Sequence, residues 1–163
     1  MARRDLLDGI DRQVRAAVRQ GATLLHGGHP LDDTAGFFYA PTVLADVHKG
    51  MSVYEEETFG PVATIITVSG PDEAAAVAND TRFGLGASVW GTDLEAAAAV
   101  GKRIESGACF INSVVASDPR MPFGGNKRSG YGRELASAGI REFVNVRTWW
   151  AMKEPGAQAP VSE

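Results

Sequence analysis

Three adjacent carboxylates, Glu55 to Glu57, are followed closely by an aromatic ring, a glycine and a proline. One of these carboxylates could accept two hydrogen bonds from a ribose diol, and the ring of Phe59 could pack on the sugar and a nicotinamide. A β-branched run begins at Val62, so the cluster would lie at a strand end, where ligand sites of α/β proteins usually lie. The three charges also repel one another, and a solvated surface is the alternative interpretation.

The single cysteine, Cys109, is a candidate nucleophile. It lies between Ala108 and Phe110, in an apolar run typical of a buried strand. Burial among apolar side chains raises the pKa of a thiol and blocks access to it. We therefore expect Cys109 to pack in the interior rather than to react.

The stretch from Phe123 to Gly132 is rich in glycines and cations, a combination that can cradle a phosphate. It has neither the spacing of a Walker A motif nor a G-x-G-x-x-G between strand and helix, so a tight surface loop is favoured. The three histidines, at positions 26, 29 and 48, have no carboxylates grouped around them in sequence. We expect them on the surface and predict no metal site.

The composition indicates one soluble globular domain of 163 residues and 17.3 kDa, with 44% hydrophobic and 22% charged residues. A net charge of −4 argues against a nucleic-acid partner. One cysteine excludes an internal disulfide and a cysteine-rich zinc cluster. No apolar run approaches the roughly 20 residues of a membrane span, and no secretory signal is recognisable. We therefore expect a cytoplasmic protein without a membrane partner.

The elements that would position these residues follow from periodicity and breakers. Helical spacing covers residues 3–20, and a proline followed by two acidic residues starts a helix over 71–79. A capping box formed by Thr92 and Glu95 starts a third helix, and a short fourth helix covers 134–138. Strand patterns occupy 23–25, part of 37–44, 62–68, 85–90, 108–112 and 142–151. Strands alternating with helices from 62 to 112 predict the α/β class, a parallel sheet with flanking helices.

The segment Glu56 to Val62 resembles the E-E-x-F-G-P-V motif of the aldehyde dehydrogenase superfamily. Other segments resemble further motifs of this family in the same order: Gly21-Ala22, Gly27-Gly28, Gly36-Phe37, Pro41-Thr42-Val43, Phe83-Gly84-Leu85, Gly107 to Asn112, and Pro122 to Glu134 with its P-F-G-G-x-K-x-S-G-x-G-R-E pattern. The resemblance runs from about Arg3 to Met152. Within the superfamily, Ala116 to Gly125 is most similar to succinate-semialdehyde dehydrogenases.

The resemblance implies a fold and roles for four residues. Residues 1–141 would be the C-terminal portion of the catalytic domain, 142–152 an oligomerisation strand and 153–163 a flexible tail. Glu57 would hold the nicotinamide ribose of NAD or NADP, with Phe59 packed beside it. Phe123 and Ser117 would line the entrance for a small aldehyde, and Ser117 could donate to a substrate carboxylate.

Family features that carry the reaction have no counterpart in this sequence. These are the dinucleotide-binding domain, the catalytic cysteine, the oxyanion-hole asparagine and the glutamate that activates water; Cys109 matches a strand position instead. We therefore assign no catalytic residue and expect a fragment, a truncated gene product or one part of a split protein. It would act as an aldehyde dehydrogenase only with the missing part, or else be a non-catalytic remnant or interaction module. We also expect self-association through 142–152.

Overall fold

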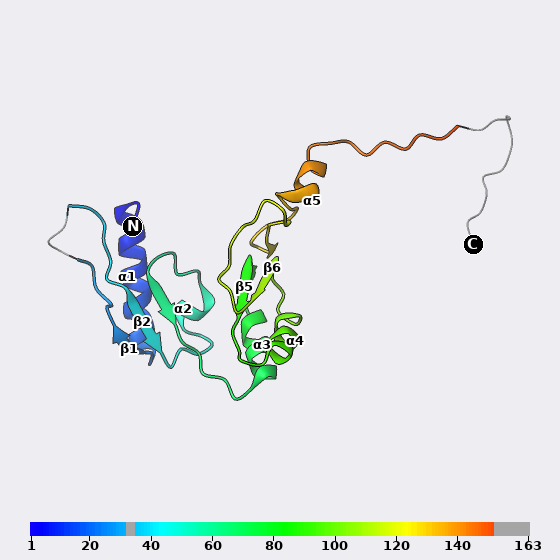
Figure 1. Ribbon diagram of the computed structural model, residues 1–163. Helices are drawn as coiled ribbons and strands as arrows, with labels where there is room; N and C mark the ends of the chain where they lie inside the picture. Colours follow the sequence, from blue (N-terminus) through cyan, green and yellow to red (C-terminus); the bar gives the residue numbers. More distant parts are fainter. Residues whose placement is uncertain (32–34, 152–163) are drawn as a thin grey trace. The chain divides into compact units, whose positions relative to one another are not determined.

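The computed structural model describes residues 1–31 and 35–151, which form two compact units that divide between Thr81 and Arg82. Each unit has its own helices and strands (Figure 1). The boundary falls within the range 1–141 predicted as one part of a catalytic domain, and that range stays a prediction. The tail predicted for 153–163 lies outside the described residues.

Unit 1, residues 1–81, is built on an amphipathic helix, α1 (Arg4–Arg19), which lies beside its strands in Figure 1. The helix buries one face, and this confirms the helical spacing in the sequence. Its apolar side chains join those of the strands and the following segment in one core: Leu7, Ile10, Val14, Ala17, Ala22, Tyr39, Leu44, Val47, Met51 and Val53.

A three-stranded mixed sheet completes the core of unit 1. It comprises β1 (Thr23–His26), β2 (Thr42–Ala45) and β3 (Val62–Thr64), in that order. The pair β1–β2 is antiparallel and the pair β2–β3 is parallel. The single-turn helix α2 (Ser52–Glu55) precedes β3, and α3 (Pro71–Asn79) has the bounds that the sequence predicts.

Unit 2, from residue 82 onwards, contains two small ladders. Its elements are β4 (Phe83–Gly84), β5 (Gly86–Val89), α4 (Leu94–Gly101), β6 (Ala108–Ile111), β7 (Asn126–Lys127) and α5 (Ala136–Arg141). The pair β5–β6 is parallel across α4, as the strand–helix–strand pattern predicts, and β4–β7 is antiparallel. The helix α4 is capped by Asp93, whose carboxylate accepts the Ala96 N–H, so the predicted cap at Thr92 is wrong by one residue.

The α/β class is confirmed, with parallel pairs β2–β3 and β5–β6 beside antiparallel pairs β1–β2 and β4–β7. Strand β3 pairs with β2 within unit 1. Sequence alternation identifies strands but not their partners. The partner of β3 comes from a segment about twenty residues earlier in the chain, outside the range that the pattern covers.

The two units differ sharply in how they are packed. The core cluster lies wholly in unit 1. Within the described part of unit 2, Ala97 is the only buried hydrophobic side chain. Large apolar side chains of unit 2 are exposed instead, among them Leu85, Trp90, Phe143, Val146 and Trp149. Little apolar burial is therefore available to stabilise unit 2.

The strand-like segment predicted for 142–151 forms no strand with any described residue of this chain. Glu142 closes α5, donating its N–H to the Gly139 carbonyl, and residues 145–151 carry no ladder. A strand needs a neighbouring strand to pair with its backbone N–H and C=O groups, and no described segment of this chain provides one for residues 142–151. Its pairing with another subunit stays a prediction.

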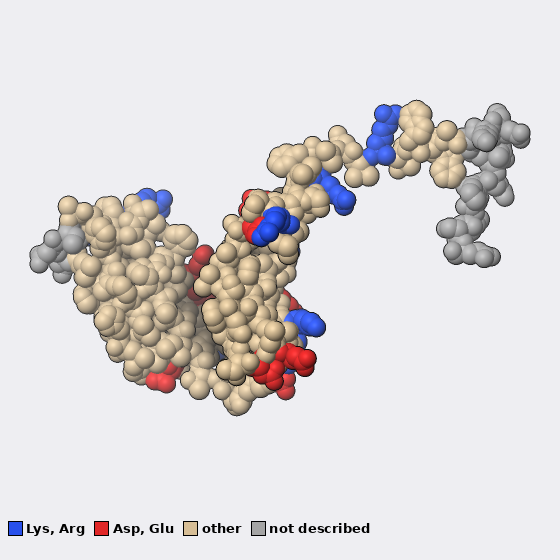
Figure 2. Space-filling view, viewed as in Figure 1, with Lys and Arg blue, Asp and Glu red and all other residues tan. Residues whose placement is uncertain are grey.

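On the face of each unit seen in Figure 2, the described Lys and Arg side chains do not gather into a continuous basic patch. No helix among the described residues is both long and apolar enough to span a bilayer.

Candidate functional site

Glu57 and Phe59 lie in the loop between α2 and β3 of unit 1. The loop is anchored at its start because Val53 of α2 is buried in the core. A tight turn follows, in which Gly60 donates its N–H to the Thr58 carbonyl and Val62 donates to the Gly60 carbonyl. A Cβ on Gly60 would lie 2.4 Å from the Ile10 Cδ1 atom, so glycine allows this loop to approach α1.

The structure brings Glu57 and Phe59 together at one cavity of about 380 Å³ between the loop and α1. The ring of Phe59 is 70% exposed, and the Glu57 side chain is exposed. Among the described residues, none is hydrogen-bonded or ion-paired to the Glu57 carboxylate. A free carboxylate beside an uncovered ring fits a ribose with an attached planar base. The carboxylate can accept hydrogen bonds from both ribose hydroxyls, and the ring can pack on the base.

Tyr54 of α2, together with Lys49 just before this helix, binds Asp80 at the end of α3. The Tyr54 hydroxyl donates to Asp80 Oδ2 across 2.7 Å, and the Lys49 ammonium lies 2.8 Å from the same atom. The hydrogen bond to the Asp80 carboxylate, followed by burial, raises the pKa of Tyr54 to about 12. The hydroxyl therefore stays protonated at neutral pH and can keep this tie.

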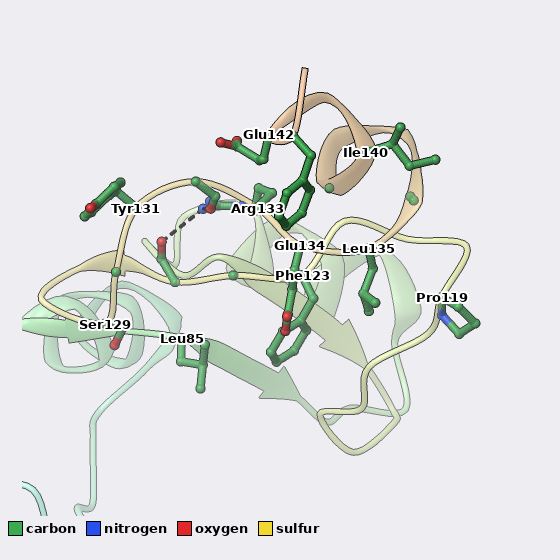
Figure 3. A pocket seen from close by; sticks show the side chains of 17 residues that line it. Leu85, Pro119, Phe123, Ser129, Tyr131, Arg133, Glu134, Leu135, Ile140 and Glu142 are labelled. Atoms are coloured by element: carbon green, nitrogen blue, oxygen red, sulfur yellow. Dashed lines mark hydrogen bonds between the residues drawn. The ribbon is translucent and has the colours of Figure 1, made fainter. Parts of the chain in front are cut away.

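Phe123 lies in unit 2, in a loop that turns back on itself. It exchanges two backbone hydrogen bonds with Glu134, of 2.9 Å and 2.8 Å. Its side chain lines a cavity of about 810 Å³ between this loop and α5. Figure 3 shows Leu85, Phe123 and Leu135 around this cavity, which is largely apolar. The wall is suited to an apolar group rather than to a phosphate.

Ser117 is not brought to the same cavity. It is exposed and does not line the space that Phe123 lines. The two residues are six positions apart in a segment without helix or strand, and sequence proximity does not determine their orientation. A shared role at an aldehyde entrance stays a prediction.

Arg133 holds the glycine-rich loop together, a role that the sequence analysis missed. Its guanidinium donates to the Gly125 carbonyl at 3.0 Å, to the Gly132 carbonyl at 2.7 Å and to Asn126 Oδ1 at 2.7 Å. Lys127 pairs with Glu105 at 3.0 Å. Arg133 and Lys127 thus bind acceptor groups of the protein itself. The structure therefore favours a surface loop over a phosphate-binding loop. The signal available in the sequence was an arginine directly after Gly132.

Cys109 is exposed, so the prediction that it is buried is wrong. It pairs with Ala87 in the β5–β6 ladder and lies under α4, where its sulfur is 3.0 Å from the position of a Cβ on Gly101. A two-stranded ladder with little packed around it leaves part of an apolar strand uncovered. No cluster of three metal-ligating side chains occurs among the described residues.

Comparison with known proteins decides the family. The pattern of the aldehyde dehydrogenase family matches residues 1–149, which is most of the chain. The chain belongs to the aldehyde dehydrogenase family. This confirms the resemblance carried by the motif around Glu57 and by the glycine-rich signature. Glu57, Phe59, Ser117 and Phe123 all fall inside the matched range of this aldehyde dehydrogenase chain.

Two relatives illustrate how similar the sequence is. A succinate-semialdehyde dehydrogenase [NADP(+)] of Mycobacterium avium is 50% identical over 143 residues, 88% of this chain and 30% of the relative. A probable succinate-semialdehyde dehydrogenase [NADP(+)] of Synechocystis is 49% identical over 92% of this chain and 33% of the relative. The aldehyde dehydrogenase chain thus spans about a third of the length of the curated relatives it matches.

Solved structures agree with the α/β fold of this aldehyde dehydrogenase chain. An NAD-dependent aldehyde dehydrogenase from Sinorhizobium meliloti matches with a TM-score of 0.84 and 46% identity, over 88% of this chain and 28% of that one. A succinic semialdehyde dehydrogenase from Streptococcus pyogenes, solved with NADP+, matches with a TM-score of 0.82 and 43% identity, over 86% and 31%.

Proposed function

We propose that this chain is the C-terminal part of an NADP-dependent succinate-semialdehyde dehydrogenase. In that enzyme, Glu57 and Phe59 would hold the nicotinamide ribose, while Phe123 and Ser117 would lie at the aldehyde entrance. The observation that carries the proposal is the unpartnered Glu57 carboxylate beside the exposed Phe59 ring at one cavity. The names of the relatives at 49–50% identity support the substrate and the coenzyme.

The bound coenzyme would supply the acceptor for a hydride from the aldehyde. Glu57 would accept hydrogen bonds from the ribose hydroxyls, and Phe59 would limit how far the attached ring can turn. Hydride transfer is sensitive to orientation because the reacting atoms must align closely. The Ser117 hydroxyl would donate to the carboxylate that distinguishes succinic semialdehyde from neutral aldehydes. The nucleophile and the water-activating group would come from the remaining part of the enzyme.

The test is Glu57→Gln in the complete enzyme. The neutral amide would hold the ribose less well, and hydride transfer should slow by about a hundredfold, the cost of roughly 1 Å of misplacement. The KM for the aldehyde should change little. Single-turnover measurement of nicotinamide reduction gives the first quantity, and steady-state kinetics gives the second.

Glu55→Gln is the matched control. It makes the same chemical change two positions earlier, where the carboxylate accepts the Gly50 N–H at 3.0 Å and does not line the cavity. Glu55→Gln should leave hydride transfer unchanged. An unchanged rate in Glu57→Gln would remove the coenzyme role of this residue and with it the main support for the proposal.

A further inference from the structure

Gln13, in the middle of α1, reaches across to the loop that carries Glu57. Its side-chain amide donates to Glu56 Oε2 at 2.9 Å and to the Glu57 carbonyl oxygen at 3.2 Å. The two partners are 43 and 44 positions away in sequence. One amide therefore ties both a side chain and the backbone of the loop to α1.

The part of α1 that carries the Gln13 side chain is held in place by neighbouring contacts. Val14, its neighbour on α1, is buried in the core. The main-chain carbonyl of Gln13 also accepts the Ser52 hydroxyl at 3.1 Å, which joins α1 to the start of α2. Gln13 lines the same cavity as Glu57 and Phe59, so its amide lies at the wall of the candidate site.

The chemistry of an amide suits this position. Glu56 and Glu57 are adjacent carboxylates and repel each other, so the backbone between them needs a donor to hold one conformation. A lysine or arginine here would attract the Glu57 carboxylate as well as that of Glu56. The neutral amide engages Glu56 and the Glu57 backbone, and the Glu57 carboxylate has no partner among the described residues.

We propose that Gln13 is a positioning residue: its amide fixes the Glu56–Glu57 backbone so that the Glu57 carboxylate points at the coenzyme ribose. This inference rests on the proposed function, because it gives Glu57 the ribose-binding role. Gln13 touches the loop rather than the reacting atoms, so it would act only through Glu57.

The first experiment tests the tether on the 163-residue chain itself. A glutamate-specific protease cleaves after Glu56 and Glu57 when this backbone opens locally. Gln13→Met keeps the length of the side chain and removes the donor. Cleavage at these two bonds should accelerate about tenfold, as expected when a hydrogen bond to a charged group is lost. Mass spectrometry locates the cuts.

Gln20→Met is the matched control for this experiment. Gln20 follows the same helix, but its side-chain oxygen accepts the Ser52 N–H at 3.1 Å and does not contact the loop. Cleavage after Glu56 and Glu57 should stay at the wild-type rate in Gln20→Met. An equal acceleration in both variants, or none in Gln13→Met, would overturn the tether.

The second experiment is a double-mutant cycle in the complete enzyme. Gln13→Met alone should slow hydride transfer about tenfold and raise the KM for the coenzyme, with the aldehyde KM unchanged. In a Glu57→Gln background it should cause no further loss, because residues that act through one another are not additive. Gln13→Glu, which removes the donor and adds repulsion toward Glu56, should be slower still as a single variant.

The arms of the cycle separate the two proposals. An unchanged rate in Glu57→Gln alone would overturn the proposed function. A loss in Glu57→Gln together with an additive loss from Gln13→Met would leave the proposed function standing and overturn the positioning role. Thermal unfolding of both Gln13 variants checks that each is folded, and Gln13→Glu provides the second variant if Gln13→Met is not.

Discussion

The Tyr39 side chain carries a hydroxyl into the core of unit 1. The residue is 5% exposed, and its hydroxyl donates to Asp11 Oδ1 across 3.2 Å. Burial, and then the charge of Asp11, raises the pKa of Tyr39 to about 12. A buried phenolate beside a carboxylate is unfavourable, so the protonated form belongs to the folded state.

We expect this pKa to appear as a loss of stability in alkali. The folded pKa of about 12 exceeds the unfolded value of about 10. The stabilisation is therefore complete below pH 10 and is lost as the pH rises through about 12. Tyr39→Phe should show a shallower decline of the free energy of unfolding between these values, measured by denaturant titration followed by circular dichroism.

Curves of the free energy of unfolding against pH that run parallel for Tyr39→Phe and the wild type would contradict the assignment of this loss of stability to Tyr39. A raised pKa at Tyr54 contributes in the same direction, so the decline in Tyr39→Phe should be reduced rather than abolished.

Close backbone contacts, rather than a core, connect the elements of unit 2. The N–H of Gly107, just before β6, donates to the Gly84 carbonyl of β4 at 3.0 Å. A Cβ on Gly107 would lie 1.6 Å from the carbonyl oxygen of Gly124 in the glycine-rich loop. Glycine at this position lets β4, β6 and the Phe123 loop meet.

Gly107→Ala should therefore destabilise unit 2 at or above the upper end of the about 1–3 kcal/mol that overpacking usually costs. The blocking atom is backbone and cannot swing aside. Gly91→Ala is the matched control in the same unit, because its Cβ would find only ordinary contacts, the nearest at 3.5 Å. Thermal unfolding monitored by tryptophan fluorescence reports on unit 2, which contains all three tryptophans. Equal unfolding temperatures for Gly107→Ala and Gly91→Ala would contradict the conclusion that a close backbone contact requires glycine at position 107.

The whole chain exposes an apolar segment after α5. The side chain of Val146 is 98% exposed, and Phe143 and Trp149 are also largely uncovered. Together with the thin packing of unit 2, this exposed surface favours association between copies. Residues 142–151, the part of this segment that the structure describes, carry no cluster of like charges that would keep copies apart. Arg147 is stacked on Trp149 at 5.2 Å.

We expect the 163-residue chain to self-associate through this segment. Val146→Lys places a charge on the segment and should raise the concentration at which association begins by about tenfold or more. Val114→Lys is the control, since Val114 is also exposed, at 68%, but lies outside the segment. Light scattering over a dilution series measures the change. A monodisperse monomer with cooperative unfolding would contradict this expectation and favour a stand-alone module.

The same chain alone should not oxidise aldehydes. We expect no turnover of succinic semialdehyde with either NAD or NADP, because by the motif resemblance no residue of this chain corresponds to the family's nucleophile or to its water-activating glutamate. Turnover that survives Cys109→Ser would contradict the family mechanism. Turnover abolished by Cys109→Ser would instead make the exposed thiol of β6 the nucleophile.

Several features could be predicted from the sequence because neighbouring residues encode them. The periodicity of Leu7, Ile10 and Val14 places α1, and the proline and acidic residues at 71–73 place α3 with its observed bounds. The ordered motifs predicted the family, and the resemblance singled out Glu57 and Phe59, whose role toward a coenzyme stays a prediction. These signals are local, so no knowledge of distant contacts was needed.

Only the tertiary structure decided which distant segments meet. The pairing of β3 with β2, the separation of Ser117 from the Phe123 cavity and the exposure of Cys109 all contradict or go beyond the sequence pattern. The tie from Gln13 to Glu56 spans 43 positions and leaves no trace in either local sequence. Strand pairing, burial and long-range hydrogen bonds depend on which surfaces meet when the chain folds, and that is a property of the whole molecule rather than of any one segment.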